Sequence, residues 1–424
     1  MKMWLCLVLC MFLLMGLISG CSFANLPPDK KSKDNASPNS DTSSSSNTSI
    51  KVDTEFVRRN TEFAFKIFNQ LNEEDEENNI FISPISISTA LAMTYQGAET
   101  TTKEAMAKVL EYYDMDIEIL NEDYKNLLQH LTKLDKKIEL NMANSIWIRE
   151  GEPVNEDFLL INKKFYDALI KELDFSKNEA ADIINHWISD TTNKKITEMI
   201  EPPISPDTLM YLINAVYFKG QWTRKFDKKN TYSAVFHAED GSTQEVMMMT
   251  LDAEAEYGQG TDFQVVRLPY GNGHIAMYCI LPKEGVSIND FTKSLNREKW
   301  DNIKSTIEEE DNVVVNLPRF KLEYGIKSLK DSLKALGMKE AFSDMADFSG
   351  IRNDVYIHDV FHKAVIEVNE EGSEAAAATV VEMRVKSVAE PIIFSADRPF
   401  IFVIADDNTG TILFIGKVHH LKID

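Results

Sequence analysis

The chain has 424 residues, of which 44% are hydrophobic, and its formal net charge is −22. This length allows one large domain or two smaller ones, and the apolar content is ample for a sizeable core. The negative charge disfavours nonspecific nucleic-acid binding, which needs basic surface to neutralise phosphates, so we expect no nucleic-acid partner.

Residues 1–20 have the pattern of a signal peptide. Lys2 supplies a positive charge, Met3–Leu17 is almost wholly apolar, and Ile18-Ser19-Gly20 leads into Cys21. The last four positions resemble a prokaryotic lipobox, so we expect Cys21 to be the lipidated first mature residue of an extracellular or cell-surface protein. An ordinary secretory signal and a transmembrane anchor are the alternatives, although the apolar run is short for an anchor. Membrane contact is expected only through this lipid, and the host could be bacterial or archaeal.

Residues 21–53 are rich in Ser, Asn, Asp and Pro, with four serines in a row at Ser43–Ser46. Such a composition cannot bury enough apolar surface to become ordered. We therefore expect a disordered tether over residues 21–53 and a folded domain over residues 54–424.

In the folded part, helical spacing of apolar residues comes first and strand-like runs follow. Helices are predicted over Thr54–Leu71, Thr101–Tyr112, Asp123–Leu134, Asn155–Ala168, Glu179–Thr191 and Leu329–Leu336, and a short strand that turns helical over Asn79–Met93. Strands are predicted over Leu209–Phe218, Phe263–Leu268, Gly273–Leu281, Val313–Phe320, Val355–Asn369, Ile392–Phe394, Phe400–Asp406 and Thr411–His419. Helices first and strands later, without strict alternation, predict an α+β domain.

The segment Glu367–Ser387 has two different faces when it is written as a strand. One face is small at first, then apolar, and never charged: Ser373, Ala375, Ala377, Thr379, Val381, Met383 and Val385. From Ser373 to Lys386, every charge lies on the other face, which consists of Glu374, Ala376, Ala378, Val380, Glu382, Arg384 and Lys386. Because successive strand side chains point to opposite faces, this pattern indicates a loop that can also become a strand. An Ala-rich helix is the alternative, since alanine has the highest helix propensity.

Catalytic motifs are missing from the sequence, which has no HExxH, CxxC, GxSxG or Walker loop. Cys279 is the single cysteine of the folded part and lies in an apolar run, so it is predicted to be a core residue. His362 also lies in an apolar run, so it is predicted to be a hydrogen-bonded core residue. The pair His419-His420 is expected to be incidental rather than metal-binding. We therefore expect no enzyme, no metal and no cofactor.

Several motifs together resemble the serpin family. They are Asn79–Ile87, Leu212–Trp222, His362-Lys363-Ala364 with Glu370 and Gly372, Phe394, Ala396–Phe400 and Thr409–Gly416. The resemblance covers about Thr54 to Leu421, in order. It implies a serpin fold of three β-sheets and eight or nine helices with an exposed reactive-centre loop.

The resemblance also implies a function, which is suicide inhibition of a serine protease, or alternatively of a cysteine protease, by a monomer. The loop is cleaved, forms an acyl-enzyme and inserts into the central sheet. Carried over by spacing, the reactive bond is Lys386–Ser387, with Arg384 as the alternative site, and either basic residue favours trypsin-like targets. The matching hinge residues are Glu370, Gly372, Ser373, Glu374, Ala375, Ala376, Ala377, Ala378 and Thr379.

By the same resemblance, four polar residues match the shutter beneath the opening sheet: Ser83, Ser86, Asn214 and His362. Trp222 matches the breach, where the loop first enters, and Arg319 is expected to pair with Glu370 there. A non-inhibitory serpin that acts as a binding module and a hydrolase of another class are the competing hypotheses. The physiological protease and the need for an activator are left open.

Overall fold

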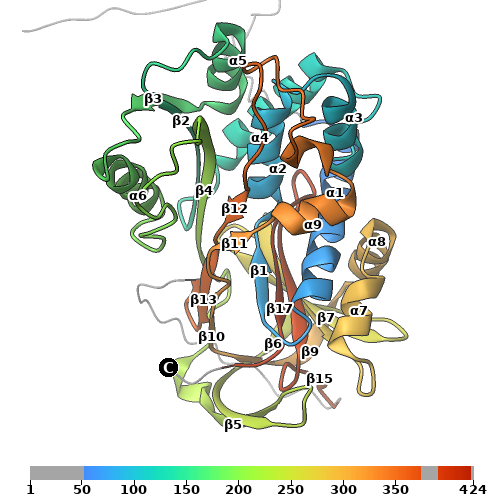
Figure 1. The fold of residues 1–424 in the computed structure, drawn as a ribbon. Helices are drawn as coiled ribbons and strands as arrows, with labels where there is room; N and C mark the ends of the chain where they lie inside the picture. Colours follow the sequence, from blue (N-terminus) through green and yellow to red (C-terminus); the bar gives the residue numbers. More distant parts are fainter. Residues whose placement is uncertain (1–51, 374–389, 422–424) are drawn as a thin grey trace, which may run out of the picture. The chain divides into compact units, whose positions relative to one another are not determined.

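The computed structural model describes residues 52–373 and 390–421. Within these residues the chain forms nine α-helices and three β-sheets, of nine, six and two strands (Figure 1). The predicted α+β class, three sheets and eight or nine helices are confirmed. The predicted reactive-centre loop lies mostly outside the described residues.

Several of the nine helices begin at residues whose side chains cap the first turn. The bounds of all nine are α1 Thr54–Glu74, α2 Pro84–Tyr95, α3 Thr100–Val109, α4 Ile117–Leu131, α5 Glu156–Tyr166, α6 Glu179–Thr191, α7 Ile288–Ser294, α8 Arg297–Ser305 and α9 Lys330–Leu336. The Asp53 side chain caps α1 by accepting from the Glu55 amide, and Ser83 caps α2 in the same way, with Pro84 at the first helical position. Gly337, with a φ of 123°, ends α9.

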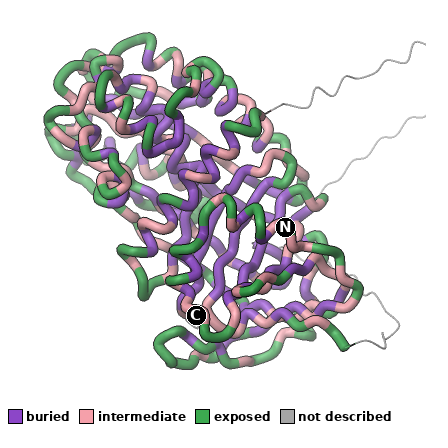
Figure 2. Tube along the Cα trace, turned by 90° about the vertical axis from the view of Figure 1, so that its right-hand side faces the viewer, coloured by how far each residue is buried: buried purple, intermediate pink, exposed green. Residues whose placement is uncertain are grey.

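The largest sheet has nine strands and contains most of the buried residues of the C-terminal half. Its strands are β1 Ile80–Ile82, β5 Tyr232–His237, β6 Thr243–Gln259, β7 Phe263–Tyr270, β8 Ile275–Pro282, β9 Glu308–Pro318, β15 Ile392–Ser395, β16 Phe400–Asp406 and β17 Thr411–Val418. Every residue of β8, β16 and β17 is buried, and the buried strands of the molecule are visible in Figure 2. A hairpin turn at Gly271–Gly273 joins β7 to β8.

The six-stranded sheet contains Asn214 of the shutter and the two hinge residues of β14. Its strands, in spatial order, are β10 Phe320–Glu323, β13 Val365–Asn369, β14 Gly372–Ser373, β4 Met210–Gln221, β2 Ile138–Arg149 and β3 Leu169–Leu173. The smallest sheet pairs β11 Lys327–Ser328 with β12 Phe361–His362, and two short 3-10 helices lie at Lys228–Asn230 and Glu340–Phe342.

Two expectations about the elements are wrong, and one long strand was not predicted. β2 lies in the first half, before α5, so helices do not all precede strands. The polar middle of β2, around Asn144, hides its strand pattern. The strand expected over 355–369 is divided into β12 and β13, because the chain at 363–364 leaves the small sheet for the six-stranded one. The sequence also did not reveal the 17-residue strand β6.

Helix α6 packs on β2 and β4 and forms a core of its own (Figure 1). Ile184 and Ile188 of the helix pack with Trp147 of β2 and Ile213 of β4 in this cluster. The indole rings of Trp147 and Trp187 meet edge to face at 5.9 Å. Because this apolar contact is non-directional, it can hold the helix on the strands without fixing their separation.

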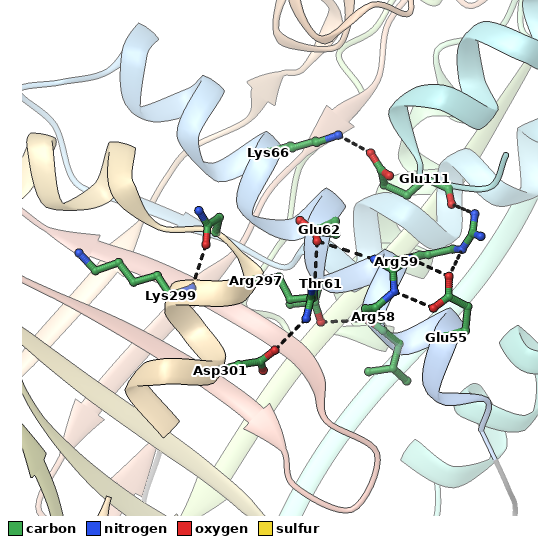
Figure 3. A network of polar contacts seen from close by, with 12 residues as sticks. Glu55, Arg58, Arg59, Thr61, Glu62, Lys66, Glu111, Arg297, Lys299 and Asp301 are labelled. Atoms are coloured by element: carbon green, nitrogen blue, oxygen red, sulfur yellow. Dashed lines mark hydrogen bonds and ion pairs between the residues drawn. The ribbon is translucent and has the colours of Figure 1, made fainter. Parts of the chain in front are cut away.

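A network of charged side chains fastens α1 to its neighbours (Figure 3). Arg59 donates to the carbonyl of Glu111 at 2.7 Å and to the Glu55 carboxylate at 2.7 Å. On the opposite side, Arg297 of α8 donates to Glu62 at 2.9 Å. The Arg297–Glu62 pair is partly exposed, and such pairs contribute little stability individually, whereas the bond from Arg59 to the Glu111 carbonyl is buried. The network therefore orients α1, while the buried strands supply most of the apolar burial.

Two further observations concern membrane-spanning helices and the cysteine. Among the helices of residues 52–373 and 390–421, none is both long enough and apolar enough to pass through a bilayer. The prediction that Cys279 is a core residue is confirmed, because its thiol is free and buried in β8 and burial raises its pKa.

Candidate functional site: the shutter and the breach

The structure brings the four predicted shutter residues together at the start of α2. The Ser83 amide donates to Nε2 of His362 at 3.1 Å, and the Ser83 hydroxyl donates to the Leu413 carbonyl at 2.7 Å. The Ser86 hydroxyl donates to Oδ1 of Asn214. The cluster thus joins α2 to β4 and β12, on which Asn214 and His362 lie.

Asn144 extends the shutter beyond the residues that the sequence indicated. Asn144 is the direct cross-strand partner of Asn214, whose amide donates to Oδ1 of Asn144 at 2.7 Å. The Asn144 amide in turn donates to the carbonyl of Tyr166, at the end of α5, at 2.6 Å. No motif marked this residue, because the contact depends on the pairing of β2 with β4.

His362 is a neutral imidazole in the shutter. Its side chain is buried, and burial lowers its pKa from 6.5 to about 4. Since the Ser83 amide donates to Nε2, that nitrogen is the acceptor and the ring proton is on Nδ1. Ionisation would break this contact and place an uncompensated charge in the core.

The hinge begins as a short strand between β13 and β4. β14 pairs Ser373 with Val368 of β13 and with Gly220 of β4, both antiparallel. Within the described residues, β14 is the strand that joins β13 to β4. Gly372 has a φ of 142°, and a Cβ atom there would lie 2.0 Å from the Gly220 carbonyl oxygen, so only glycine fits.

Glu370 is held by the cation that the resemblance assigned to it. Arg319 Nε lies 2.8 and 2.9 Å from the two carboxylate oxygens of Glu370, and the Thr231 hydroxyl donates to the same group at 2.6 Å. Glu370 is 2% exposed. Burial raises its pKa, but the hydrogen bonds from Arg319 and Thr231 outweigh burial, so the pKa lies below its usual value.

Glu371 forms a second anchor that sequence reasoning missed. Its carboxylate accepts from Lys225 Nζ at 2.6 Å and lies 3.3 Å from Lys228 Nζ. Burial raises the pKa of Glu371, but the two lysines lower it by more. The pKa therefore lies below its usual value, and the carboxylate remains ionised. The spacing of the two lysines was visible in the sequence, but nothing there connected them to a residue about 140 positions later.

Trp222, which the resemblance assigned to the breach, lies beside the turn between β13 and β14. Its indole Nε1 donates to the Asn369 carbonyl at 2.9 Å, and its amide donates to the Glu371 carbonyl at 2.9 Å. The indole stacks on Tyr270, with ring centroids 4.3 Å apart. Trp222 therefore contacts both sides of the turn that carries Glu370 and Glu371.

The remaining predicted site residues lie outside the described residues. They are the hinge residues Glu374 to Thr379, the alternative cleavage site Arg384, the reactive bond Lys386–Ser387 and the lipidation site Cys21. In the part of the chain that is described, no three His, Cys, Asp or Glu side chains are arranged to hold a metal ion.

The profile of serpins, described as serine protease inhibitors, matches residues 58–421. The chain belongs to the serpin family. A serpin-like protein of Thermococcus kodakarensis is 40% identical over 368 residues, covering 85% of this chain and 84% of that one. Human neuroserpin is 33% identical over 375 residues, covering 85% and 90% of the two chains. Native tengpin, a thermophilic serpin, superposes with a TM-score of 0.79 and 33% identity, over 88% of this chain and 95% of that one. Serpins are generally protease inhibitors rather than catalysts.

Proposed function

We propose that this serpin inhibits trypsin-like serine endopeptidases by a suicide-substrate mechanism. The observation that carries the proposal is the placement of Ser373. Its backbone is already paired with strands on both sides, and its side chain points into the core, 1% exposed. The start of the hinge is therefore in the position and orientation that an inserting strand needs.

The register of β14 predicts how the strand would continue. Ser373 pairs with Gly220 and with Val368, and both pairings are antiparallel. Continued in that register, Thr379 would fall opposite Asn214 on one side and His362 on the other, at the shutter. The residues on the same face as Ser373 are the small, uncharged ones, so insertion would bury no unpaired charge. It would also add main-chain hydrogen bonds on both sides, as β-augmentation does.

The reactive bond of the proposal is Lys386–Ser387. The catalytic serine oxygen of the protease attacks the carbonyl of Lys386, the amine of Ser387 leaves, and the ester is trapped when insertion distorts the protease. A lysine before the scissile bond suits an acidic specificity pocket. Arg384 is the alternative site, and cleavage there would leave the class of target unchanged.

Incubation with trypsin tests the function. We expect a covalent complex that survives SDS. The released C-terminal peptide, identified by mass spectrometry, should begin at Ser387. Lys386→Asp should abolish the complex, and Ala375→Arg should convert the inhibitor into a substrate because a bulky charge would enter the core. A matched Glu382→Arg variant, on the charged face, should retain trapping.

The non-inhibitory alternative predicts a different set of results. The loop would be cleaved without a stable complex, and cleaved and intact protein would unfold at the same temperature. Those two results together would contradict the proposed inhibition, whichever protease was used.

We also propose export and lipid anchoring through Cys21. The proposal is supported by the apolar run and small residues before this cysteine. In cells fed labelled fatty acid, the parent should carry label in the membrane fraction and Cys21→Ser should not. An unlabelled parent found in the medium would indicate an ordinary secretory signal instead.

A further inference from the structure

Tyr270 is a buried residue of the nine-stranded sheet that contacts the hinge of the six-stranded one. It ends β7 and is fully buried, and its hydroxyl lies 2.8 Å from the Ser373 hydroxyl. Ser373 is the last described residue before the reactive-centre segment. A side chain from one sheet therefore contacts the inserting strand of the other.

The Tyr270 ring is held in place on several sides. Trp222 stacks on it at 4.3 Å with an interplanar angle of 13°, and Phe218 meets it edge to face at 5.2 Å. A Cβ atom at Gly220 would lie 2.7 Å from the ring, so the β4 backbone also closes against it. A ring fixed in this way can present its hydroxyl at one position only.

We propose that Tyr270 is a positioning residue for loop insertion, whose hydroxyl holds Ser373 in the strand position between β13 and β4. The proposal rests on the proposed inhibitory function and adds a residue to its first step. If the hinge withdrew from the sheet, the phenol would be buried without this partner, which is costly. Burial also raises the pKa of Tyr270 well above its usual value, so the hydroxyl keeps its proton throughout the working pH range. The contact therefore biases the hinge toward insertion before the loop is cut.

Hydrogen–deuterium exchange of the full-length protein tests the contact without any protease. Tyr270→Phe keeps the ring and its stacking but removes the hydroxyl, and Ser373→Ala removes the partner. We expect each variant to exchange the amides of the Gly372–Ser373 segment roughly fivefold faster, the change expected from one neutral hydrogen bond. The double variant should exchange no faster than either single one. Tyr278→Phe is the matched control, because its hydroxyl donates to Asp407 at 2.5 Å and does not contact the hinge.

Three outcomes decide the proposal. Unchanged hinge exchange in both single variants, or effects that add in the double variant, would overturn the contact. A parallel measurement of inhibitor consumed per trypsin complex formed tests the link to insertion, and we expect this ratio to rise about twofold in the variants. Faster hinge exchange with an unchanged ratio would overturn the positioning role. If the parent forms no complex while the coupling is observed, the proposed function fails and the contact stands.

Discussion

The shutter and the breach hold the same sheet by opposite electrostatic means. The shutter is a neutral cluster in which Ser83, Ser86, Asn214 and His362 are joined by hydrogen bonds without any ionised group. The breach holds two adjacent carboxylates, Glu370 and Glu371, against Arg319, Lys225 and Lys228.

The contrast fits what each region would do in the proposed insertion. A strand would enter between β4 and β13 at the shutter, where neutral hydrogen bonds can be exchanged for new ones at small net cost. Charged pairs there would leave a buried ion while the strands part. In the proposed insertion the turn at the breach would remain in place, so the stronger charged contacts could persist. Arg319 is 41% exposed, which limits the desolvation cost of the pair.

The largest expected effect is the response of the shutter to acid. The pKa of His362 is about 4 in the fold, below its ordinary 6.5, so the unfolded chain binds the proton first on acidification. The contribution of His362 to stability is therefore complete above pH 6.5 and falls as the pH falls toward 4, by up to about 3 kcal/mol. Urea unfolding at several pH values checks this. The His362→Gln side chain can still accept from the Ser83 amide but does not titrate. Its loss of unfolding free energy between pH 6.5 and 4 should therefore be smaller than that of the parent by about 3 kcal/mol. If the stability of parent and variant fell equally with pH, the neutral shutter would be contradicted.

Removing a cation from the breach should have the next largest effect. Arg319→Met leaves the Glu370 carboxylate buried with only Thr231 as a side-chain donor. We expect a loss of about 2 kcal/mol in the free energy of unfolding at pH 7, below the usual range for a buried pair because Arg319 is half-exposed. The double variant Arg319→Met with Glu370→Gln should recover most of this loss in urea unfolding. An equally unstable double variant would show that the charge of Glu370 is not the cause.

Asn144→Ala should destabilise the extended shutter by about 1.5 kcal/mol. The substitution leaves the amide of Asn214 and the carbonyl of Tyr166 without their partners. Thermal unfolding compares it with Asn141→Ala, a variant of the same strand whose side chain is partly exposed. If the two variants lost the same stability, Asn144 would have no special part in the shutter.

The smallest effect is expected at the second anchor of the breach. Lys225→Met removes a cation from Glu371, but Lys228 remains 3.3 Å away, so the loss should be about 1 kcal/mol. Removing both lysines should cost more than twice as much, because the carboxylate is then uncompensated. Added salt should reduce the contribution of Lys228 to the free energy of unfolding, because this side chain is 60% exposed. The contribution of Lys225 should fall less. Additive single losses in urea unfolding would show that the two lysines act independently.

Sequence and structure agree best where the information is local or lies in a long motif. The helices α1, α5, α6 and α9 and the hairpin at Gly271 were predictable from periodicity, caps and turn residues. The strands β2 and β6 were not, because their polar and apolar residues follow the packing of neighbours rather than simple alternation. The resemblance supplied Glu370 and Arg319 as a pair, and the structure brings them into contact.

The sequence by itself determined the family and the two-faced hinge segment, because these depend on residue order and on the period-two geometry of a strand. Only the tertiary structure decided which distant side chains meet: Asn144 with Asn214, Lys225 with Glu371, and Tyr270 with Ser373. Such contacts depend on how strands pair and how two sheets meet, and no local pattern encodes contacts between residues 70 to 146 positions apart.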